Sequence, residues 1–133
     1  MLKGLTKDKW QKRFPFFLKI EESFDTTRYF SYREIECGSG WYDLIWGLCE
    51  QIEEELDKET ADVRNKFAIT QVKEKLGRLR INTYAANKAI DDLVTKAERK
   101  SLGICQRCGK PGKLRKGSYW STLCDDCCQD SEK

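Results

Sequence analysis

The sequence predicts an α+β fold in which an amphipathic helix, a β-hairpin and a second helix surround one core, followed by a C-terminal zinc ribbon. In two stretches, apolar residues recur every three or four positions, a period typical of helices. Between those stretches, two strand-like runs flank a short turn. Two cysteine pairs with metal-ligand spacing close the chain, which at 133 residues has room for one ordinary core.

Residues 1–36 form an aromatic-rich N-terminal segment without a clean period, in which we expect a short helix followed by irregular or strand-like structure. Pro15 would interrupt a helix that begins near Thr6. The segment has no apolar run of the kind that directs secretion, and no stretch of the chain approaches the roughly 18 apolar residues of a membrane span. We therefore expect a cytoplasmic protein.

A helix–hairpin–helix core is expected over residues 37–102. The glycines of CGSGW predict a turn, and a helix should run from about Trp41 to Lys58. Its apolar positions fall on one stripe: Trp41, Leu44, Ile45, Leu48, Cys49, Ile52 and Leu56. Tyr42 and Trp46 lie one turn apart outside this stripe. We expect them to be exposed and to anchor a protein partner, as aromatic residues often do. The alternative is that Trp46 belongs to the core and is buried by the aromatic N-terminal segment.

A β-hairpin is expected next, pairing residues 67–75 with 78–84. Gly77 can take the positive φ that a tight connection needs. A second helix should follow at about 86–101, with Gly103 placed to end it. The apolar stripe of this helix is Ala86, Ala89, Ile90, Leu93, Val94 and Ala97.

The hairpin region is basic, whereas the helix before it is acidic. Six basic residues and one acidic residue lie between positions 64 and 80, and seven acids lie in 50–62 against one lysine. Because alternate strand residues share a face, one face of the hairpin should carry Lys73, Lys75, Arg78 and Arg80, and the other Val72, Leu79 and Ile81. Such a cluster can hold phosphate or carboxylate groups. The alternative is a solvated sheet face, or one paired with the acidic helix.

The C-terminal segment, residues 103–133, contains two CxxC pairs: Cys105 with Cys108, and Cys124 with Cys127. A two-residue gap lets both thiolates of a pair face one ion, and the fifteen residues between the pairs can form a small hairpin. Four thiolates at about 2.3 Å in a tetrahedron make a closed, structural Zn²⁺ site. Two free pairs and an iron site of rubredoxin type are the alternatives.

Three cysteines are left over by this assignment: Cys37, Cys49 and Cys128. Cys49 is expected to be a small buried apolar residue. We expect Tyr119 and Trp120 to pack against the metal-binding turns. The ribbon is either a staple that closes the C-terminus onto helix 86–101 or a recognition surface for an anion. In the second case the basic arm would act through Lys110, Lys113, Arg115 and Lys116.

Overall charge and residue usage indicate a binding protein. The formal net charge is +3, and four thiolates with one Zn²⁺ reduce it to about +1, so overall basicity does not mark a nucleic-acid binder. The chain has no histidine, which excludes Cys–His and Ser–His nucleophilic pairs. It also has neither a P-loop nor a GxGxxG motif. We therefore predict that the protein is not an enzyme.

Three motifs occur in order: ECGSGWYDLIWGLC, VKEKLGRLRINTY and CQRCGKPGKLRKGSYWSTLCDDC. This combination, over about residues 36–128, resembles an uncharacterised family of small phage and bacterial proteins with the pattern ECGxGWYxLI, VKEKFGGLRFY and CxxCGxPGxxR…W…LCxxC. The chain has Leu76, Arg78 and Ile81–Asn82 where that pattern has Phe, Gly and Phe–Tyr. The resemblance implies a phage-like accessory protein that interferes with a host defence or regulatory system.

The leading hypothesis is therefore a non-enzymatic, zinc-stabilised binding protein that engages a host protein in the host cytoplasm and inhibits a defence system. A second hypothesis is a sponge for a small anionic ligand, such as a signalling nucleotide, that uses the hairpin lysines and arginines. A third is a nucleic-acid-binding regulator that uses the ribbon arm. None of the three involves a membrane partner.

Overall fold

The computed structural model describes residues 6–19 and 34–131 of the chain. The helical elements are α1 (Lys7–Arg13), η3 (Ser39–Trp41), α3 (Tyr42–Asp57), α4 (Ala61–Lys66), α5 (Lys88–Lys100), η4 (Ser101–Gly103) and α6 (Asp125–Ser131). The strands are β1 (Ile35–Glu36), β2 (Ala68–Lys75), β3 (Arg78–Tyr84), β4 (Lys113–Arg115) and β5 (Ser121–Leu123). The predicted α+β class is confirmed. Residues 20–33, part of the segment expected to be irregular or strand-like, lie outside the described residues.

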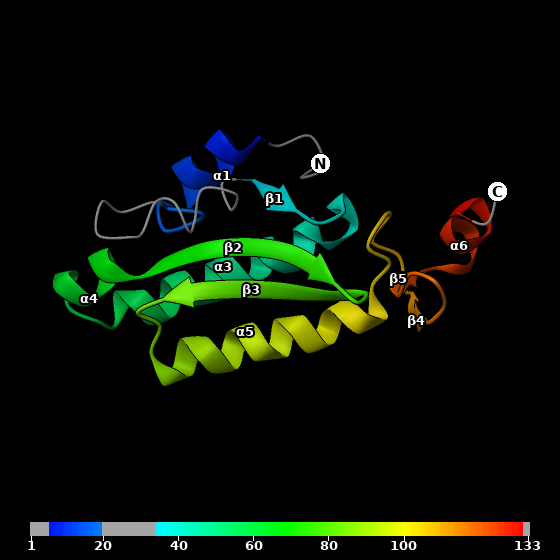
Figure 1. Cartoon of the computed structure of the whole chain (residues 1–133). Coiled ribbons are helices and arrows are strands. Elements are labelled where there is room, and N and C mark those ends of the chain that lie inside the picture. Colours follow the sequence, from blue (N-terminus) through cyan, green and yellow to red (C-terminus); the bar gives the residue numbers. More distant parts are fainter. Residues whose placement is uncertain (1–5, 20–33, 132–133) are drawn as a thin grey trace.

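Two small sheets organise the fold. The first has the order β1-β2-β3, with β1 parallel to β2 and β3 antiparallel to it, and the second pairs β4 with β5. The long helices α3 and α5 pack together beside the β2–β3 hairpin, and the β4–β5 ribbon lies at the hairpin's turn (Figure 1). The core is therefore built between the hairpin and the two helices.

The β2–β3 hairpin has the predicted division of faces. Lys73 lies opposite Arg80 and Lys75 opposite Arg78, so these four cations share one face. Val72, Leu79 and Ile81 are buried on the other face. The two turn residues, Leu76 and Gly77, both have positive φ, at 55° and 78°. The two-residue period of a strand thus predicted correctly which face of this hairpin packs on the core.

Helix α5 covers the free edge of β3 as well as the core. The Leu79 amide donates to Ser101 Oγ at 3.0 Å, and the Ile81 amide donates to Glu98 Oε2 at 2.9 Å. These bonds satisfy two donors of an edge strand, which would otherwise be open to pairing with another chain. Along α5, Ile90, Val94 and Ala97 are buried as predicted. Ala89, which was placed on the same stripe, is exposed instead.

Helix α1 packs across the N-terminal half of α3. The buried Trp10 ring lies 5.1 Å from the Trp46 ring and 5.6 Å from the Tyr42 ring, and the Phe14 ring lies 4.9 Å from Trp46. Arg13 also forms a two-pronged ion pair with Glu53, with contacts of 2.7 and 3.1 Å. The expectation that Tyr42 and Trp46 are exposed is therefore wrong, and the alternative, that the N-terminal segment buries Trp46, is confirmed. Both are half-buried against the core, and the protein-partner hypothesis loses that anchor.

No helix in the part of the chain that the structure describes is both long enough and apolar enough to cross a membrane.

Candidate metal centre

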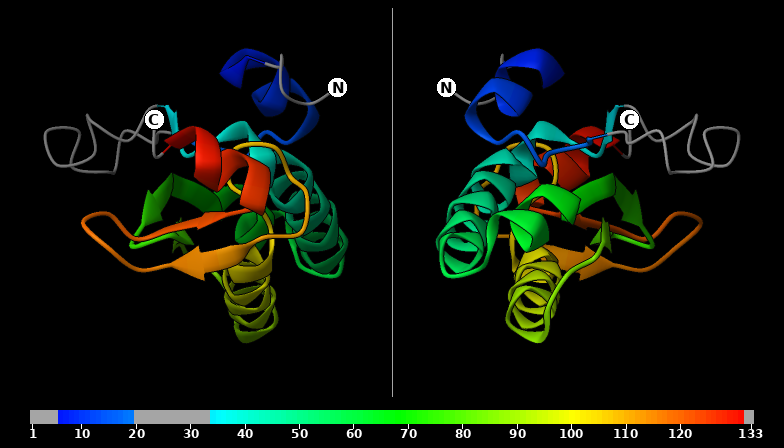
Figure 2. Two further views of the ribbon diagram at one scale, coloured as in Figure 1. Left: turned by 90° about the vertical axis from the view of Figure 1, so that its right-hand side faces the viewer. Right: turned by 90° about the vertical axis from the view of Figure 1, so that its left-hand side faces the viewer.

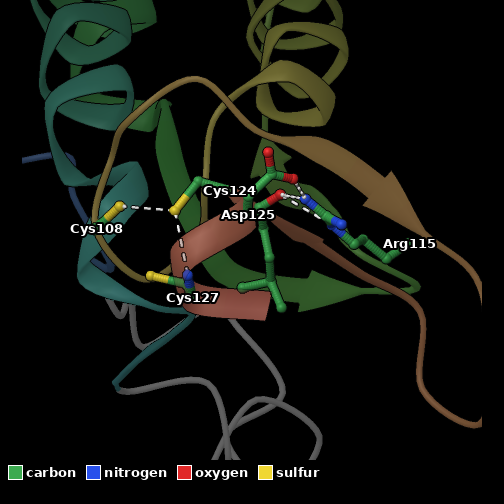
Figure 3. A network of polar contacts seen from close by, with 6 residues as sticks. Cys108, Arg115, Cys124, Asp125 and Cys127 are labelled. Atoms are coloured by element: carbon green, nitrogen blue, oxygen red, sulfur yellow. Dashed lines mark hydrogen bonds and ion pairs between the residues drawn. The ribbon is translucent and has the colours of Figure 1, made fainter. Parts of the chain in front are cut away.

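Four cysteine thiols converge at the C-terminal ribbon. The sulfur atoms of Cys105, Cys108, Cys124 and Cys127 all lie within 4.8 Å of one another. The Cys108 and Cys124 sulfurs are 3.6 Å apart, and Figure 3 shows the Cys108, Cys124 and Cys127 side chains directed toward one point. The two CxxC pairs, nineteen positions apart along the chain, thus form one cluster that can hold a metal ion.

Each pair lies on a backbone turn that aims both thiols inward. In the first turn, the Cys105 amide donates to the Lys110 carbonyl at 2.7 Å, and the Gly109 amide donates back to the Cys105 carbonyl at 2.9 Å. Gly109 has φ of 84°, the left-handed conformation in which a side chain is unfavourable, so glycine suits this position. In the second turn, the Cys127 amide donates to Cys124 Sγ at 3.4 Å as α6 begins.

The environment favours one thiolate in this cluster. Burial acts to raise the pKa of Cys105, but hydrogen bonds from the backbone amides of Cys124, Cys108 and Arg107 outweigh it and lower this pKa to about 6. The pKa of Cys127 is raised to about 12, chiefly by its hydrogen bond to the Cys124 thiol. An ion that binds all four sulfurs must displace the protons that these thiols carry.

The ribbon docks on the glycine loop before α3. The Gly40 amide donates to the Gln106 carbonyl at 3.0 Å, and Trp41 Nε1 donates to the Ile104 carbonyl at 2.8 Å. A Cβ atom on Gly40 would overlap the Cys105 carbonyl, and one on Gly38 would overlap the Gln106 carbonyl. The glycines of CGSGW, predicted only to form a turn, therefore allow the backbone of the first metal-binding turn to approach.

The ribbon also docks on the turn of the β2–β3 hairpin. Thr122 Oγ1, which is buried, donates to the Gly77 carbonyl at 2.6 Å. A Cβ atom on Gly77 would lie 2.6 Å from Leu114 Cδ1 and 3.0 Å from Ser121 Cα. The ribbon thus closes onto the glycine loop and the hairpin turn. The ribbon therefore closes the C-terminus onto the rest of the fold, as expected, but helix 86–101 is not the main surface on which it packs.

The three remaining cysteines lie outside the cluster of four. Cys49 is fully buried in α3, as predicted, and burial raises the pKa of its thiol. Cys37 packs against the core, and burial, with a smaller contribution from Glu74, raises its pKa to about 12. Cys128 is half-buried on α6, where its amide donates to the Cys124 carbonyl at 3.0 Å.

Arg115 is bonded within the ribbon. Its guanidinium donates to the Leu123 carbonyl through Nε and Nη2 at 3.2 and 3.1 Å, and it forms a 2.7 Å ion pair with Asp125 (Figure 3). This hydrogen bond also lowers the pKa of Asp125. Arg115 was predicted to bind an anionic partner. The structure places it instead as a link between β4, the end of β5 and the start of α6.

Tyr119 and Trp120 do not pack against the metal-binding turns. The Tyr119 side chain is 89% exposed and that of Trp120 is 39% exposed, in the loop between β4 and β5. The Lys116 ammonium lies over the Trp120 ring, 4.8 Å from its centroid. The expectation that both aromatics pack against these turns is wrong, since both residues are exposed.

The basic hairpin face carries four cations, and Glu36 of β1 lies beside Lys73 in the parallel register. Within residues 6–19 and 34–131, no carboxylate forms an ion pair with Lys73, Lys75, Arg78 or Arg80. The buried Nε of Arg78 has no hydrogen-bond partner there. The acidic helix does not neutralise this face: Glu53 of α3 pairs with Arg13, and Glu55 pairs with Lys58.

A groove of about 430 Å³ runs between α3 and α5, away from the hairpin's basic face. Its floor is apolar, including Leu48 and Ala97. One rim is acidic and the other basic, with Asp43, Glu50 and Glu54 facing Lys96 and Lys100. Nearly balanced rims give this groove little preference for the charge of a partner, in contrast to the hairpin face.

Comparisons with protein-family models, with curated proteins and with solved structures find no match to this chain.

Proposed function

We propose that this chain is a non-enzymatic, zinc-stabilised binding protein that holds an anionic partner on the basic face of its β2–β3 hairpin. One observation carries the proposal: two like-charged pairs, Lys73 with Arg80 and Lys75 with Arg78, lie directly opposite each other across the hairpin. Like charges in cross-strand positions destabilise a sheet. A partner that supplies negative charge would remove that cost.

Zinc is the metal we propose for the cysteine cluster. Sulfurs at about 2.3 Å from a tetrahedral zinc lie about 3.8 Å from one another. The 3.6 Å separation of the Cys108 and Cys124 sulfurs fits this geometry, and the 4.8 Å limit for all four requires only a small contraction. Four thiolates leave no open position for substrate, so the ion's role is structural. It would hold the ribbon against the glycine loop and the hairpin turn.

Arg78 supports an anionic partner in a second way. Its Nε is buried without a hydrogen-bond acceptor among the described residues, although an arginine donor removed from water ordinarily has one. Only the two turn residues, Leu76 and Gly77, separate Arg78 from Lys75 along the chain. Lys75 is exposed on the same face of the hairpin as Arg78. A phosphate or carboxylate oxygen at the turn end of the face would therefore meet cations from both strands.

Replacing Arg80 by glutamate is expected to keep the fold and to weaken binding of inorganic polyphosphate by about tenfold or more. Arg80 is exposed, so the change leaves the core untouched, but it removes one phosphate contact and adds a repulsive charge. The slope of log Kd against log salt concentration should also fall by about one. Titrations monitored by calorimetry at several salt concentrations measure both quantities.

Lys96→Glu is the matched control, because it makes the same charge change on exposed α5 and lines the α3–α5 groove. It should bind polyphosphate within about twofold of the unchanged protein. Leu79→Asp, one residue from Arg80 but on the buried face, should unfold the protein because it buries an unpaired charge. If Lys96→Glu abolishes binding and Arg80→Glu does not, the site is the groove and the proposal is wrong.

A further inference from the structure

Exposed apolar side chains lie on both sides of the contact between the hairpin turn and the ribbon. Among the described residues, the large hydrophobic side chains with high exposure are Leu76, Tyr84, Tyr119 and Trp120. Three of these four flank a single contact, because Leu76 precedes Gly77, Tyr119 and Trp120 precede Ser121, and Gly77 packs against Ser121. The hairpin turn and the ribbon loop thus present one apolar and aromatic tip, which we define as Leu76, Tyr119 and Trp120.

Leu76 makes this tip unusual. Its side chain is 60% exposed, and its φ of 55° lies in the left-handed region that non-glycine residues seldom adopt. A two-residue turn with positive φ at both positions favours Asn–Gly or Asp–Gly over Leu–Gly. The chain therefore accepts both backbone strain and apolar exposure at one residue. Such outliers concentrate at functional sites.

The tip is continuous with the basic hairpin face. Lys75 and Arg78 flank the turn directly, and Lys116 lies over the Trp120 ring. In the left view of Figure 2, the loop between β4 and β5 extends to the side of the sheet away from α3. A ligand that follows the basic face toward the turn would therefore reach the aromatic residues of the ribbon loop.

Building on the proposed function, we propose that the anionic partner is single-stranded nucleic acid, whose phosphates lie along the basic face and whose bases stack on Tyr119 and Trp120. Proteins that bind single strands combine a basic track with exposed aromatic rings in this way. The Lys73–Arg80 and Lys75–Arg78 pairs lie about 7 Å apart along the strands, two residues at about 3.3–3.4 Å each. Successive phosphates of an extended strand have a similar spacing.

Two other partners could use some of the same residues. An anionic membrane surface also attracts lysines and interfacial aromatics. However, the two charged pairs form a line along one hairpin, which suits a linear polyanion better than a planar surface. A protein partner would use the apolar tip but has no general need for two successive pairs of cations beside it. Double-stranded nucleic acid keeps its bases stacked within the helix and leaves the exposed rings unused.

The test compares oligothymidylate with an abasic strand, which differs from it only in lacking bases, and with two other anionic ligands. Zinc-loaded full-length protein is titrated by fluorescence anisotropy with oligothymidylate of about 20 nucleotides, longer than the roughly 4–16 nucleotides that a single-strand site covers. The second probe is an abasic oligodeoxynucleotide of the same length, and the third is inorganic polyphosphate. Vesicles containing phosphatidylserine form a fourth arm. We expect the unchanged protein to prefer oligothymidylate to the abasic strand by about tenfold or more, the effect of a stacked base.

Tyr119→Ala/Trp120→Ala should remove that preference and leave affinity for the abasic strand and for polyphosphate unchanged. Tyr84→Ala is the matched control, because Tyr84 is an exposed aromatic at the opposite end of β3 from the turn. It should bind oligothymidylate like the unchanged protein. If the double variant loses zinc or its folded circular-dichroism spectrum, Tyr119→Ala alone replaces it in the test, since Tyr119 is almost wholly exposed.

The outcomes separate this inference from the function on which it rests. Equal affinity for oligothymidylate and the abasic strand overturns the inference while leaving polyanion binding in place. The inference is also overturned if the double variant still prefers oligothymidylate to the abasic strand, because the bases then stack elsewhere. Binding to the vesicles without binding to oligothymidylate assigns the tip to a membrane surface. Failure to bind polyphosphate, the abasic strand and oligothymidylate alike overturns the proposed function itself.

Discussion

Cys108→Ser is expected to release the metal and unfold the ribbon. The Cys108 residue is exposed, so serine should not disturb packing, and its loss acts through the metal alone. The ribbon's own core consists of little more than Cys105, Leu123 and Cys124. Structural zinc sites contribute about 10–16 kcal/mol to folding, far more than a cluster of this size can replace. Metal content by mass spectrometry and circular dichroism measure the loss.

Cys128→Ser is the control and should retain one metal ion per chain. Counting reactive thiols in the unchanged protein adds an independent check, because four of its seven cysteines would be metal-bound. Cys49 is buried and Cys37 is half-buried, and burial raises the pKa of both thiols. Both remain protonated and unreactive at neutral pH, since only the thiolate reacts readily. One thiol, Cys128, should react in the native protein, and four more should react after a chelator is added. Release of the metal by Cys128→Ser would show that the ligands are misassigned.

Gly40→Ala should lower the free energy of unfolding by about 1–3 kcal/mol or more, the cost of overfilling a packed site. The new methyl group would overlap the Cys105 carbonyl and lie 2.6 Å from the Gln106 carbonyl carbon. Both neighbours are backbone atoms of the metal-binding turn and cannot rotate away. The Gly40–Gln106 hydrogen bond would lengthen as well. Chemical denaturation, followed by tryptophan fluorescence, measures the change.

Gly47→Ala makes the same chemical change but is expected to have the opposite effect on stability. Gly47 lies inside α3, and a Cβ there would meet no atom within 4 Å. Alanine is favoured over glycine in a helix interior by about 0.5–1 kcal/mol, so this variant should be more stable than the unchanged protein. Equal effects of the two substitutions would mean that the glycine loop does not hold the ribbon.

The hairpin and the cysteine cluster could be predicted because each depends on local spacing. The alternation that places Val72 and Leu79 inside follows from the two-residue period of a strand. The clustering of the four cysteines follows from two CxxC turns, whose geometry is set by neighbouring residues. Helix α4 was missed, since its six residues carry no apolar stripe; its signal is the Thr60 cap, which accepts from the Val63 amide at 3.4 Å.

The errors concern contacts between elements that are distant in the sequence. Trp46 lies off the apolar stripe of its own helix, and only the separate helix α1 buries it, through Trp10 and Phe14. In the same way, nothing local to Gly38 and Gly40 indicates that residues 105–106 will pack on them. Tyr119 was wrongly expected to pack inward, because aromatic residues are ordinarily buried where a core can receive them. The ribbon's own core, Cys105, Leu123 and Cys124, is small.

The most direct test of a shared binding surface is the amide chemical-shift map of ¹⁵N-labelled, zinc-loaded protein titrated with oligothymidylate. The largest shifts are expected at residues 73–80 of the hairpin and 116–120 of the ribbon loop, since both line the proposed surface. Amides that face the α3–α5 groove should stay unchanged. Shifts confined to that groove, with the hairpin and the ribbon loop silent, would contradict the account.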